Sequence, residues 1–142
     1  MEYRKQAHIT YRADYHLVFV TKYRRKVLKG GMREYLKECM KGIVRIFPEV
    51  EILEQNGGEE HVHQLISIPP KYSVAEIVKY LKGSSAYIMR RKFTFLDQVY
   101  YGADGIWSDG YFVSTVGVDE ETIRRYIDHQ GLEDGGQVRL EL

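Results

Sequence analysis

The period at which apolar residues recur changes repeatedly along the chain, and this alternation limits the possible folds more than any other feature. Alternating positions or short continuous apolar runs, which are typical of strands, occupy residues 15–21, 50–56, 61–68 and 111–116. Helical spacing or helix-start signals mark residues 32–47, the segment after Ser73 and residues 119–130. The predicted order is therefore β-α-β-β-α-β-α, and its first six elements match the ferredoxin-like βαββαβ arrangement.

Local signals indicate where the predicted helices begin and end. Pro48 ends the first helix, because proline lacks the backbone N–H that would continue the hydrogen-bond ladder. Ser73 is a good N-cap for the second helix, and Asp119 caps the third. Gly131 is a candidate stop for the third helix, which leaves residues 131–142 as a C-terminal tail.

The expected fold class is α+β, with an antiparallel sheet, two helices on one of its faces and an additional C-terminal helix. Residues 93–109 are expected to form a long irregular connection before the last strand. The first six elements leave one face of the sheet uncovered, and we expect helix 119–130 to cover that face. The length of 142 residues fits one domain, so we expect residues 1–142 to fold together.

The composition is that of an ordinary globular protein. Hydrophobic residues make up 44% of the chain and charged residues 29%, which excludes a disordered chain. A single cysteine, Cys39, excludes an intramolecular disulfide framework and predicts a reducing compartment. No apolar run approaches the ~18 residues of a membrane span, and the N-terminus has no apolar signal segment. We therefore expect a cytoplasmic protein without a membrane partner.

Charged residues are strongly segregated although the formal net charge is only +1. Residues 1–48 and 71–92 are basic, whereas residues 49–70 and 93–142 are acidic. Such segregation can create a local basic surface on a neutral protein. The densest basic stretch is Lys22-Tyr23-Arg24-Arg25-Lys26. Two interpretations of this stretch are open: a solvated loop, or a patch that contacts phosphates and stacks a base on its tyrosine.

A pair of histidines on the third predicted strand is the first candidate for chemistry. His61 and His63 lie two positions apart, so their side chains point to the same face of the strand. Two neutral imidazoles side by side can form two corners of a metal site. A bare His-x-His pair is a weak motif, and two partly exposed polar residues on a sheet surface are the alternative.

A second pair lies on the last predicted helix. Tyr126 and Gln130 are four positions apart and share one helix face, which Ile123 and Ile127 flank. The carboxamide oxygen of a glutamine is a hard ligand that suits Mg²⁺ or Mn²⁺. Taken alone, the pair favours the alternative that Tyr126 is an ordinary residue at the edge of the core, since the chain has twelve tyrosines.

The two pairs together suggest one mechanism. Two histidines and an amide oxygen fit a hexacoordinate Mg²⁺ or Mn²⁺ with open positions, which can polarise a phosphodiester. A tyrosine would attack the phosphorus and form a phosphotyrosine ester. Because that ester conserves the energy of the phosphodiester, a free 3′-hydroxyl can later rejoin the strands without ATP. This chemistry is strand transfer rather than hydrolysis.

Several segments occur in a characteristic order along the chain: 15–19 with 22–24, then 60–67, 81–86, 106–108 with Tyr111, and 126–130. In this order and spacing they resemble the motifs of the single-tyrosine HUH transposases of hairpin-ended insertion sequences. Segment 60–67, Glu-His-Val-His-Gln-Leu-Ile-Ser, is similar to the HUH motif itself. The resemblance covers most of the chain, and several ordered matches are much more specific than one.

The resemblance implies a role for each residue of the two pairs. Tyr126 would be the nucleophile, and His61, His63 and Gln130 would be the metal ligands. The substrate would be single-stranded DNA with imperfect-palindrome hairpins, and the protein would act at the nucleoid of a prokaryotic cell. A homodimer would complete its active sites in trans. The DNA-contacting candidates are Lys22, Tyr23, Arg24, Arg25, Lys26, Lys82, Ser84 and Ser85.

Two residues depart from the family pattern. Glu60 stands where an aspartate is usual, and both residues are acidic. Gln64 stands where an aliphatic residue is usual. By strand parity Gln64 points with Val62 and Ile66 toward the helices, so we expect it to need a buried hydrogen-bond partner.

Two other functions are compatible with parts of the sequence. A relaxase-like or replication-initiator-like nickase would use the same chemistry, but 142 residues leave no room for a helicase or other partner domain. A domesticated ferredoxin-like nucleic-acid-binding module would keep the basic stretch and its aromatic residues. Such a module would need neither a nucleophilic Tyr126 nor a metal.

Overall fold

The computed structural model describes residues 4–6, 9–11 and 13–135. Its main sheet is antiparallel, with the strand order β4-β5-β3-β6. These strands are β3 (Asp14–Val20), β4 (Glu51–Gly57), β5 (His61–Ser67) and β6 (Phe112–Ser114). The two central strands come first and third among the four along the chain, which is the ferredoxin-like order. The predicted α+β fold class is therefore confirmed.

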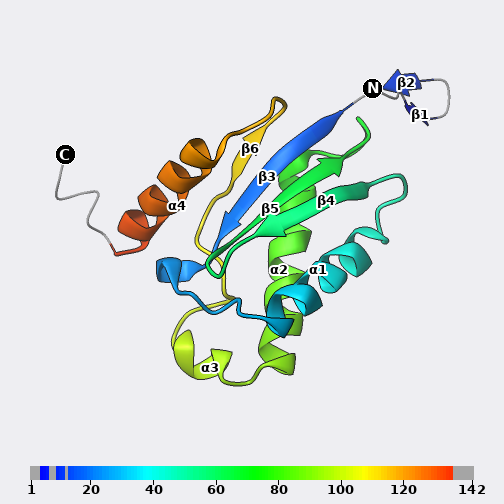
Figure 1. The fold of residues 1–142 in the computed structure, drawn as a ribbon. Helices are drawn as coiled ribbons and strands as arrows, with labels where there is room; N and C mark the ends of the chain where they lie inside the picture. Colours follow the sequence, from blue (N-terminus) through cyan, green and yellow to red (C-terminus); the bar gives the residue numbers. More distant parts are fainter. Residues whose placement is uncertain (1–3, 7–8, 12, 136–142) are drawn as a thin grey trace.

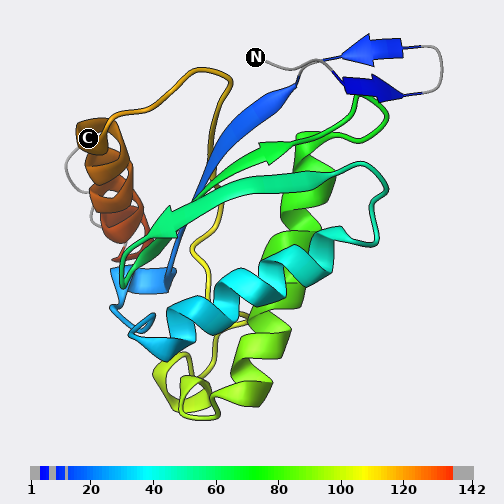
Figure 2. The same ribbon diagram turned by 45° about the vertical axis from the view of Figure 1, so that its right-hand side comes forward.

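Three long helices cover the two faces of this sheet. They are α1 (Gly31–Val44), α2 (Val74–Lys92) and α4 (Glu120–Gly135). Figures 1 and 2 show α1 and α2 together on one face, while α4 lies on the other side, next to β6 and β3. As expected, the last helix packs on the face that the first six elements leave uncovered. None of the described helices is both long enough and apolar enough to cross a membrane.

Some elements differ from the sequence-based expectations. A hairpin of β1 (Arg4–Gln6) and β2 (Ile9–Tyr11) precedes the sheet, and α3 (Leu96–Val99) interrupts the expected irregular connection. Gly131 does not stop α4, which continues to Gly135. The expected tail therefore begins later, and residues 136–142 lie outside the described part of the chain.

The two faces of β3 contribute to two separate apolar clusters. Leu17 and Phe19 are fully buried in the main core beneath α1 and α2. Val18 and Val20 face the other way and pack with the fully buried Ile127 of α4. Each fully buried side chain of this size stabilises the fold by roughly 1.5–3 kcal/mol. The main core therefore fixes the sheet, whereas a much smaller cluster attaches α4 to it.

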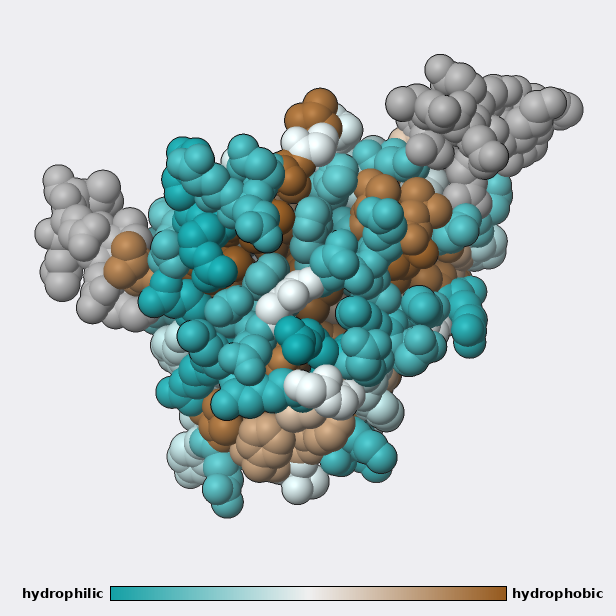
Figure 3. Space-filling view, in the orientation of Figure 1, coloured by the Kyte–Doolittle hydropathy of each residue, from teal (hydrophilic) through white to brown (hydrophobic). Residues whose placement is uncertain are grey.

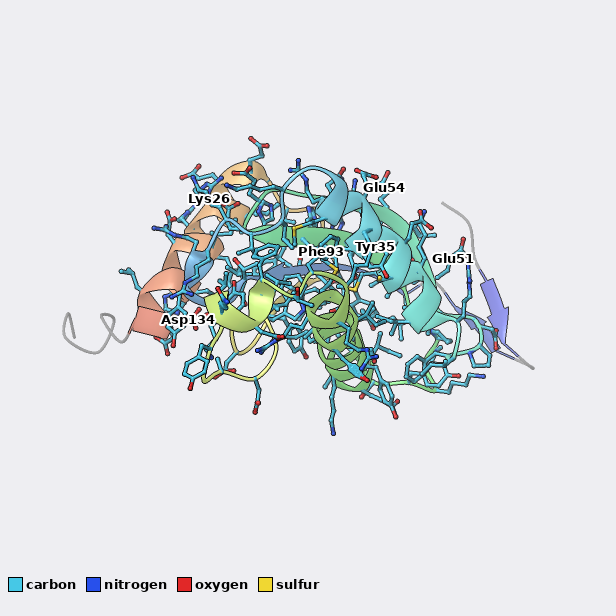
Figure 4. All side chains as sticks on the ribbon, turned by 90° about the horizontal axis from the view of Figure 1, so that it is seen from below. Lys26, Tyr35, Glu51, Glu54, Phe93 and Asp134 are labelled. Carbon is cyan, nitrogen blue, oxygen red and sulfur yellow. The ribbon has the colours of Figure 1, made fainter. Side chains whose placement is uncertain are left out.

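Contacts between aromatic residues tie the ends of the helices on the main-core side. Tyr35 of α1 and Phe93, just after α2, meet edge to face with ring centroids 5.6 Å apart (Figure 4). This geometry is the one that aromatic pairs prefer. It helps hold α1 and α2 as one layer under the sheet.

Gln64 has a hydrogen-bond partner for one half of its amide. It is fully buried, and its Nε2 donates to Oε1 of the partly buried Gln55 at 3.0 Å. Gln55 in turn donates from Nε2 to the backbone oxygen of Lys37 in α1, also at 3.0 Å. Oε1 of Gln64 has no partner among the described residues. The expected hydrogen bond is thus present for the amide nitrogen alone, and the chain of two bonds links β5 through β4 to α1.

Candidate active site

The histidine pair lies on the face of the sheet against which α4 packs. His61 and His63 belong to β5, and their partners across the β3–β5 ladder are Val20 and Val18. Directly opposed residues of an antiparallel pair share a face, so the imidazoles lie on the same side as the two valines that contact Ile127. The sequence-based placement of both histidines on one face is confirmed.

Glu60 holds the imidazole of His61. Its carboxylate Oε1 is 2.9 Å from Nδ1 of His61, and its Oε2 is 4.0 Å from a guanidinium nitrogen of Arg124 in α4. Burial alone would raise the pKa of Glu60, but the hydrogen bond from His61 and the nearby positive charges outweigh it and bring the pKa below its usual value. The carboxyl group is therefore ionised at neutral pH.

His16 is a residue of this site that the sequence-based reasoning missed. Its Nδ1 lies 3.2 Å from Nε2 of His63 across the β3–β5 ladder. Burial lowers the pKa of His63, and the neighbouring His16 and His61 lower it further. His63 is therefore neutral at pH 7, which is the form that binds metal ions. Strand parity was the available signal, because His16 alternates with Leu17 and shares a face with Val18.

A pocket of about 730 Å³ opens beside the histidine pair. His61 and His63 line it from β5, Asn56 from the adjacent strand and Arg124 from α4. Ile123 and the two glutamates at the start of α4 complete its wall. The space is large enough for a phosphodiester group and its flanking atoms. Figure 3 shows that this side of the molecule is mainly hydrophilic.

Tyr126 is not among the described residues that line this pocket. Its ring packs instead against Phe112 of β6, with centroids 5.7 Å apart. Residues two positions apart on a helix point about 200° from each other, so Tyr126 and Arg124 face opposite ways. Burial, with a smaller contribution from Asp134, raises the pKa of Tyr126 to about 12. The phenol is therefore protonated, and in this arrangement its ring packs against β6 and does not line the histidine pocket.

Gln130 is anchored at the other end of α4. It is buried, and its Nε2 donates to Oγ of Ser108 at 3.1 Å and to the backbone oxygen of Asp109. Both bonds use the amide nitrogen, whereas a cation would use Oε1. Gln130 does not line the histidine pocket, so the structure does not bring the three expected ligands together.

Further polar contacts fasten the same half of α4. The carboxylate of Asp134 accepts from the backbone N–H of Tyr23 at 2.8 Å and from Oγ of Ser108 at 2.9 Å. Arg24 forms an ion pair with Asp128. Figure 4 shows Asp134 at the end of α4, next to the short 3-10 helix η1 (Lys22–Arg24). The last helix is thus tied to η1 and the loop before β6 more by polar contacts than by apolar burial.

The donor set tests whether a divalent cation fits here. Within the described residues, no cluster of three or more His, Cys, Asp or Glu side chains could hold a metal ion. The histidine pair supplies two nitrogen donors, and the remaining positions would need amide or water oxygens. Two nitrogens with hard oxygens suit Mg²⁺ or Mn²⁺ better than a four-coordinate structural zinc site. The two histidines therefore supply part of the donor set that such a cation needs, and Gln130 does not stand beside them in this arrangement.

The basic stretch is only partly available to DNA. Arg24 is paired with Asp128, and Arg25 donates to the backbone oxygen of Val99. Tyr23 is 46% exposed, and the cationic ends of Lys22 and Arg25 lie 5.9 and 5.2 Å from its ring centroid. Lys26 is exposed (Figure 4). Lys22, Tyr23 and Lys26 thus keep the surface position that a DNA contact requires.

Two of the DNA-contacting candidates on α2 make internal contacts. Ser85 is fully buried, and its hydroxyl accepts a hydrogen bond from the indole N–H of Trp107 at 3.0 Å. Lys82 donates from Nζ to the backbone oxygens of Ser108 and Gly110 at 2.7 and 2.8 Å. In this arrangement Lys82 and Ser85 secure the loop before β6, and their contact with DNA stays a prediction. Ser84 is partly exposed and also remains a candidate.

Comparison with solved structures defines the class of protein. A crystal structure of a Deinococcus radiodurans protein assigned as a transposase is similar with a TM-score of 0.77 and 32% identity, over 89% of this chain and 97% of that chain. A REP-associated tyrosine transposase, solved with a REP hairpin bound, has a TM-score of 0.55 over 98% of this chain and 77% of that chain. Its identity is 15%, so this second likeness concerns the fold alone. The fold is that of DNA-cleaving transposases.

The particular family follows from the sequence. The family model described as "Transposase IS200 like" matches residues 9–130, and the chain belongs to this family. The transposase of insertion sequence IS200 from Salmonella typhimurium is 37% identical over 128 residues, which cover 90% of this chain and 83% of the relative. The ISDra2 transposase TnpA of Deinococcus radiodurans is 30% identical over 131 residues, 92% of both chains. The resemblance and the enzyme class predicted from the sequence are confirmed.

Proposed function

We propose that this transposase cleaves and rejoins single-stranded DNA at insertion-sequence ends, with a divalent metal and a covalent 5′-phosphotyrosine intermediate. The observation that carries the proposal is the pocket in which His61 and His63 face α4, the helix that bears Tyr126. Family membership supports the same activity. We place the reaction in the cytoplasm of a prokaryotic cell, at the nucleoid.

His61, His63 and Gln130 would hold the metal ion. When bound, Mg²⁺ or Mn²⁺ supplies charge neutralisation at the non-bridging oxygens of the scissile phosphate. Glu60 orients His61, and the lowered pKa of His63 keeps that imidazole neutral and able to donate its lone pair. Asn56 and Arg124 line the same pocket and would contact the DNA backbone there.

Tyr126 would carry out the chemical step. Its hydroxyl loses a proton, the oxygen attacks phosphorus, and the bond from phosphorus to the 3′-oxygen breaks. The products are a 5′-phosphotyrosine ester and a strand with a free 3′-hydroxyl. In the second step a 3′-hydroxyl attacks the ester, which restores the phosphodiester and releases the tyrosine.

A movement of α4 would complete the site. Tyr126 packs on Phe112 and does not line the pocket, so we propose that α4 turns or moves before the phenol reaches a phosphate beside His61. We propose a homodimer in which α4 of one subunit completes the histidine pocket of the other. The five residues between β6 and α4 include Gly117, which suits a hinge for this exchange.

We further propose that the substrate carries a DNA hairpin. The exposed Tyr23 and Lys26, with the partly buried Lys22, offer two cations and an aromatic ring to a nucleic acid. The REP-associated transposase of similar fold was solved with a REP hairpin bound. A hairpin end would provide both a duplex backbone and a single-stranded flank for such a surface.

One assay tests the whole proposal. Labelled single-stranded DNA with the hairpin end of the element is incubated with the protein and Mn²⁺ or Mg²⁺, and covalent adducts are separated by denaturing electrophoresis. We expect an adduct that disappears in Tyr126→Phe and on chelation with EDTA, and that persists in Tyr101→Phe. Tyr101 is a suitable control because it is 90% exposed.

The same assay distinguishes the other functions. Tight DNA binding without any adduct would identify a nucleic-acid-binding module instead of an enzyme. An adduct that forms but never rejoins to a supplied 3′-hydroxyl end would identify a nickase. An adduct that persists in Tyr126→Phe would place the nucleophile elsewhere.

A further inference from the structure

We infer that Glu60 is a positioning residue of the metal site: it selects the tautomer of His61 that presents Nε2 to the pocket. This inference rests on the proposed role of His61 as a metal ligand. It concerns the protein before any ion binds, since the contact between Glu60 and His61 is already formed.

Glu60 is held in place independently of the histidine. Its backbone oxygen accepts a hydrogen bond from the amide N–H of Thr21 at 2.9 Å. The hydroxyl of Thr21 also lies 3.1 Å from this oxygen, and its shorter contact is with the backbone oxygen of Arg25 at 2.7 Å. Thr21 is fully buried at the end of β3, and only 10% of the Glu60 side chain is exposed. The carboxylate therefore starts from a fixed backbone and has little room to search for other partners.

The chemistry of the contact determines where the proton of His61 lies. An ionised carboxylate can only accept hydrogen bonds, so the nitrogen 2.9 Å away must carry the hydrogen. That nitrogen is Nδ1 of His61. A neutral imidazole has one N–H, so Nε2 keeps its lone pair. Because His61 lines the pocket, this lone pair is the one available to a metal ion.

Gly58 leaves the space that this contact occupies. A Cβ atom at residue 58 would lie 2.9 Å from Oε1 of Glu60 and 3.3 Å from Nδ1 of His61. Both distances are too short, and the carboxylate, as the end of a flexible side chain, would be displaced first. An alanine at this position therefore offers a way to disturb the contact without removing the charge.

Arg124 lies near the other oxygen of the same carboxylate. Its guanidinium is 4.0 Å from Oε2 of Glu60, a loose ion pair, while Oε1 faces His61. The two oxygens thus have different neighbours, and the positive charge of Arg124 favours the ionised carboxylate. The neighbouring Glu59 is only partly buried, whereas Glu60 is buried. Glu59 therefore provides a matched control for substitutions of Glu60.

The experiment compares Glu60→Leu, Glu60→Gln, Gly58→Ala and the control Glu59→Gln with the wild type. Nitrogen-15 NMR of the metal-free proteins reports which ring nitrogen of His61 is protonated, and electron paramagnetic resonance measures the binding of Mn²⁺. We expect a single Nδ1–H form in the wild type and in Glu59→Gln. We expect mixed tautomers in the other variants and a 10- to 100-fold weaker affinity for Mn²⁺ in Glu60→Leu.

Glu60→Gln is expected to lie between the wild type and Glu60→Leu. The amide oxygen can still accept from Nδ1–H, but the amide nitrogen can equally donate to a bare Nδ1. A purely structural role would lower stability in Glu60→Leu and leave the tautomer of His61 unchanged. Circular dichroism and the fluorescence of Trp107 show whether each variant is folded.

The outcomes separate this inference from the proposed function. If the wild type binds Mn²⁺ and forms the DNA adduct, but Glu60→Leu keeps both the Nδ1–H form and the affinity, the inference on Glu60 is overturned alone. A second outcome is that the wild type has the Nδ1–H form, that Glu60→Leu loses this form, and that the wild type binds no Mn²⁺. In that case the proposed metal site is overturned. If the wild type has Nε2–H on His61, the assigned tautomer is wrong.

Discussion

His16 and His63 meet across strands β3 and β5, with Nδ1 of His16 3.2 Å from Nε2 of His63. One ring must donate and the other accept, so the contact requires at least one of these nitrogens to be unprotonated. It also places two imidazoles where a positive charge on one disfavours a positive charge on the other. The histidine site is therefore a group of three coupled rings instead of an isolated pair.

The first prediction concerns the charge of His63. Replacing His16 by Gln removes a neighbour that lowers the pKa of His63, while the burial that contributes most remains. We expect the pKa of His63 to rise in His16→Gln but to stay below 6.5. A proton NMR titration of the ring measures this. His129→Gln is the control, because His129 is exposed, and it should leave the pKa of His63 unchanged.

The same shift has a consequence for stability. The pKa of His63 is lower in the folded protein than the value of 6.5 expected when it is unfolded. The unfolded chain therefore binds the proton more tightly, and folding loses stability as the pH falls through 6.5 toward the folded pKa. Urea unfolding at pH 7.5 and pH 5.5 should show this loss. This loss of stability should be smaller in His16→Gln than in the wild type. An equal loss in both proteins would contradict the effect of His16 on the pKa of His63.

A second prediction follows from the burial of Tyr126. Its pKa is raised from 10.0 to about 12, so the protonated phenol is favoured in the folded state. Stability from this residue is complete below pH 10 and falls as the pH rises from 10 through 12. Ultraviolet titration should show a late-titrating tyrosine that is absent in Tyr126→Phe. Tyr100, with its pKa also near 12, should still titrate late in that variant.

A third prediction tests the structural role of Ser85. In Ser85→Ala the buried indole N–H of Trp107 loses its hydrogen-bond acceptor. We expect a loss of about 1–3 kcal/mol in the free energy of unfolding, the usual cost of a buried unsatisfied polar group. Ser84→Ala is the matched control and should change stability by less than about 0.5 kcal/mol. Equal effects in the two variants would mean that the bond to Trp107 adds nothing to stability.

A fourth prediction concerns the attachment of α4. Asp134→Ala removes two hydrogen bonds, to Tyr23 and to Ser108. Because the apolar cluster beneath α4 is small, we expect amide hydrogen exchange to become faster throughout α4 while β3 and β5 stay protected. Glu133→Ala, which changes an exposed neighbour, should have no such effect. Loss of protection in the sheet would show that α4 and the core unfold as one unit.

The order and type of the main elements could be predicted from the sequence, because periodicity and capping are local properties. The placement of His61 and His63 on one face followed from strand parity alone. A hydrogen bond from Gln64 was also predictable, since a buried amide among apolar neighbours is costly without one, but only its nitrogen has a partner among the described residues. The continuation of α4 past Gly131 was not, because contacts made by Asp134 with residues distant in the sequence extend the helix.

The sequence by itself determined the family, the sheet and the set of residues able to carry chemistry. Only the tertiary structure decided how those residues are engaged. It turned Tyr126 toward Phe112, tied Gln130 to Ser108, buried Ser85 beneath Trp107 and brought His16 against His63. Each of these contacts joins residues from different elements. A helix fixes the angle between its own side chains, but its rotation against a sheet depends on contacts that no local pattern records.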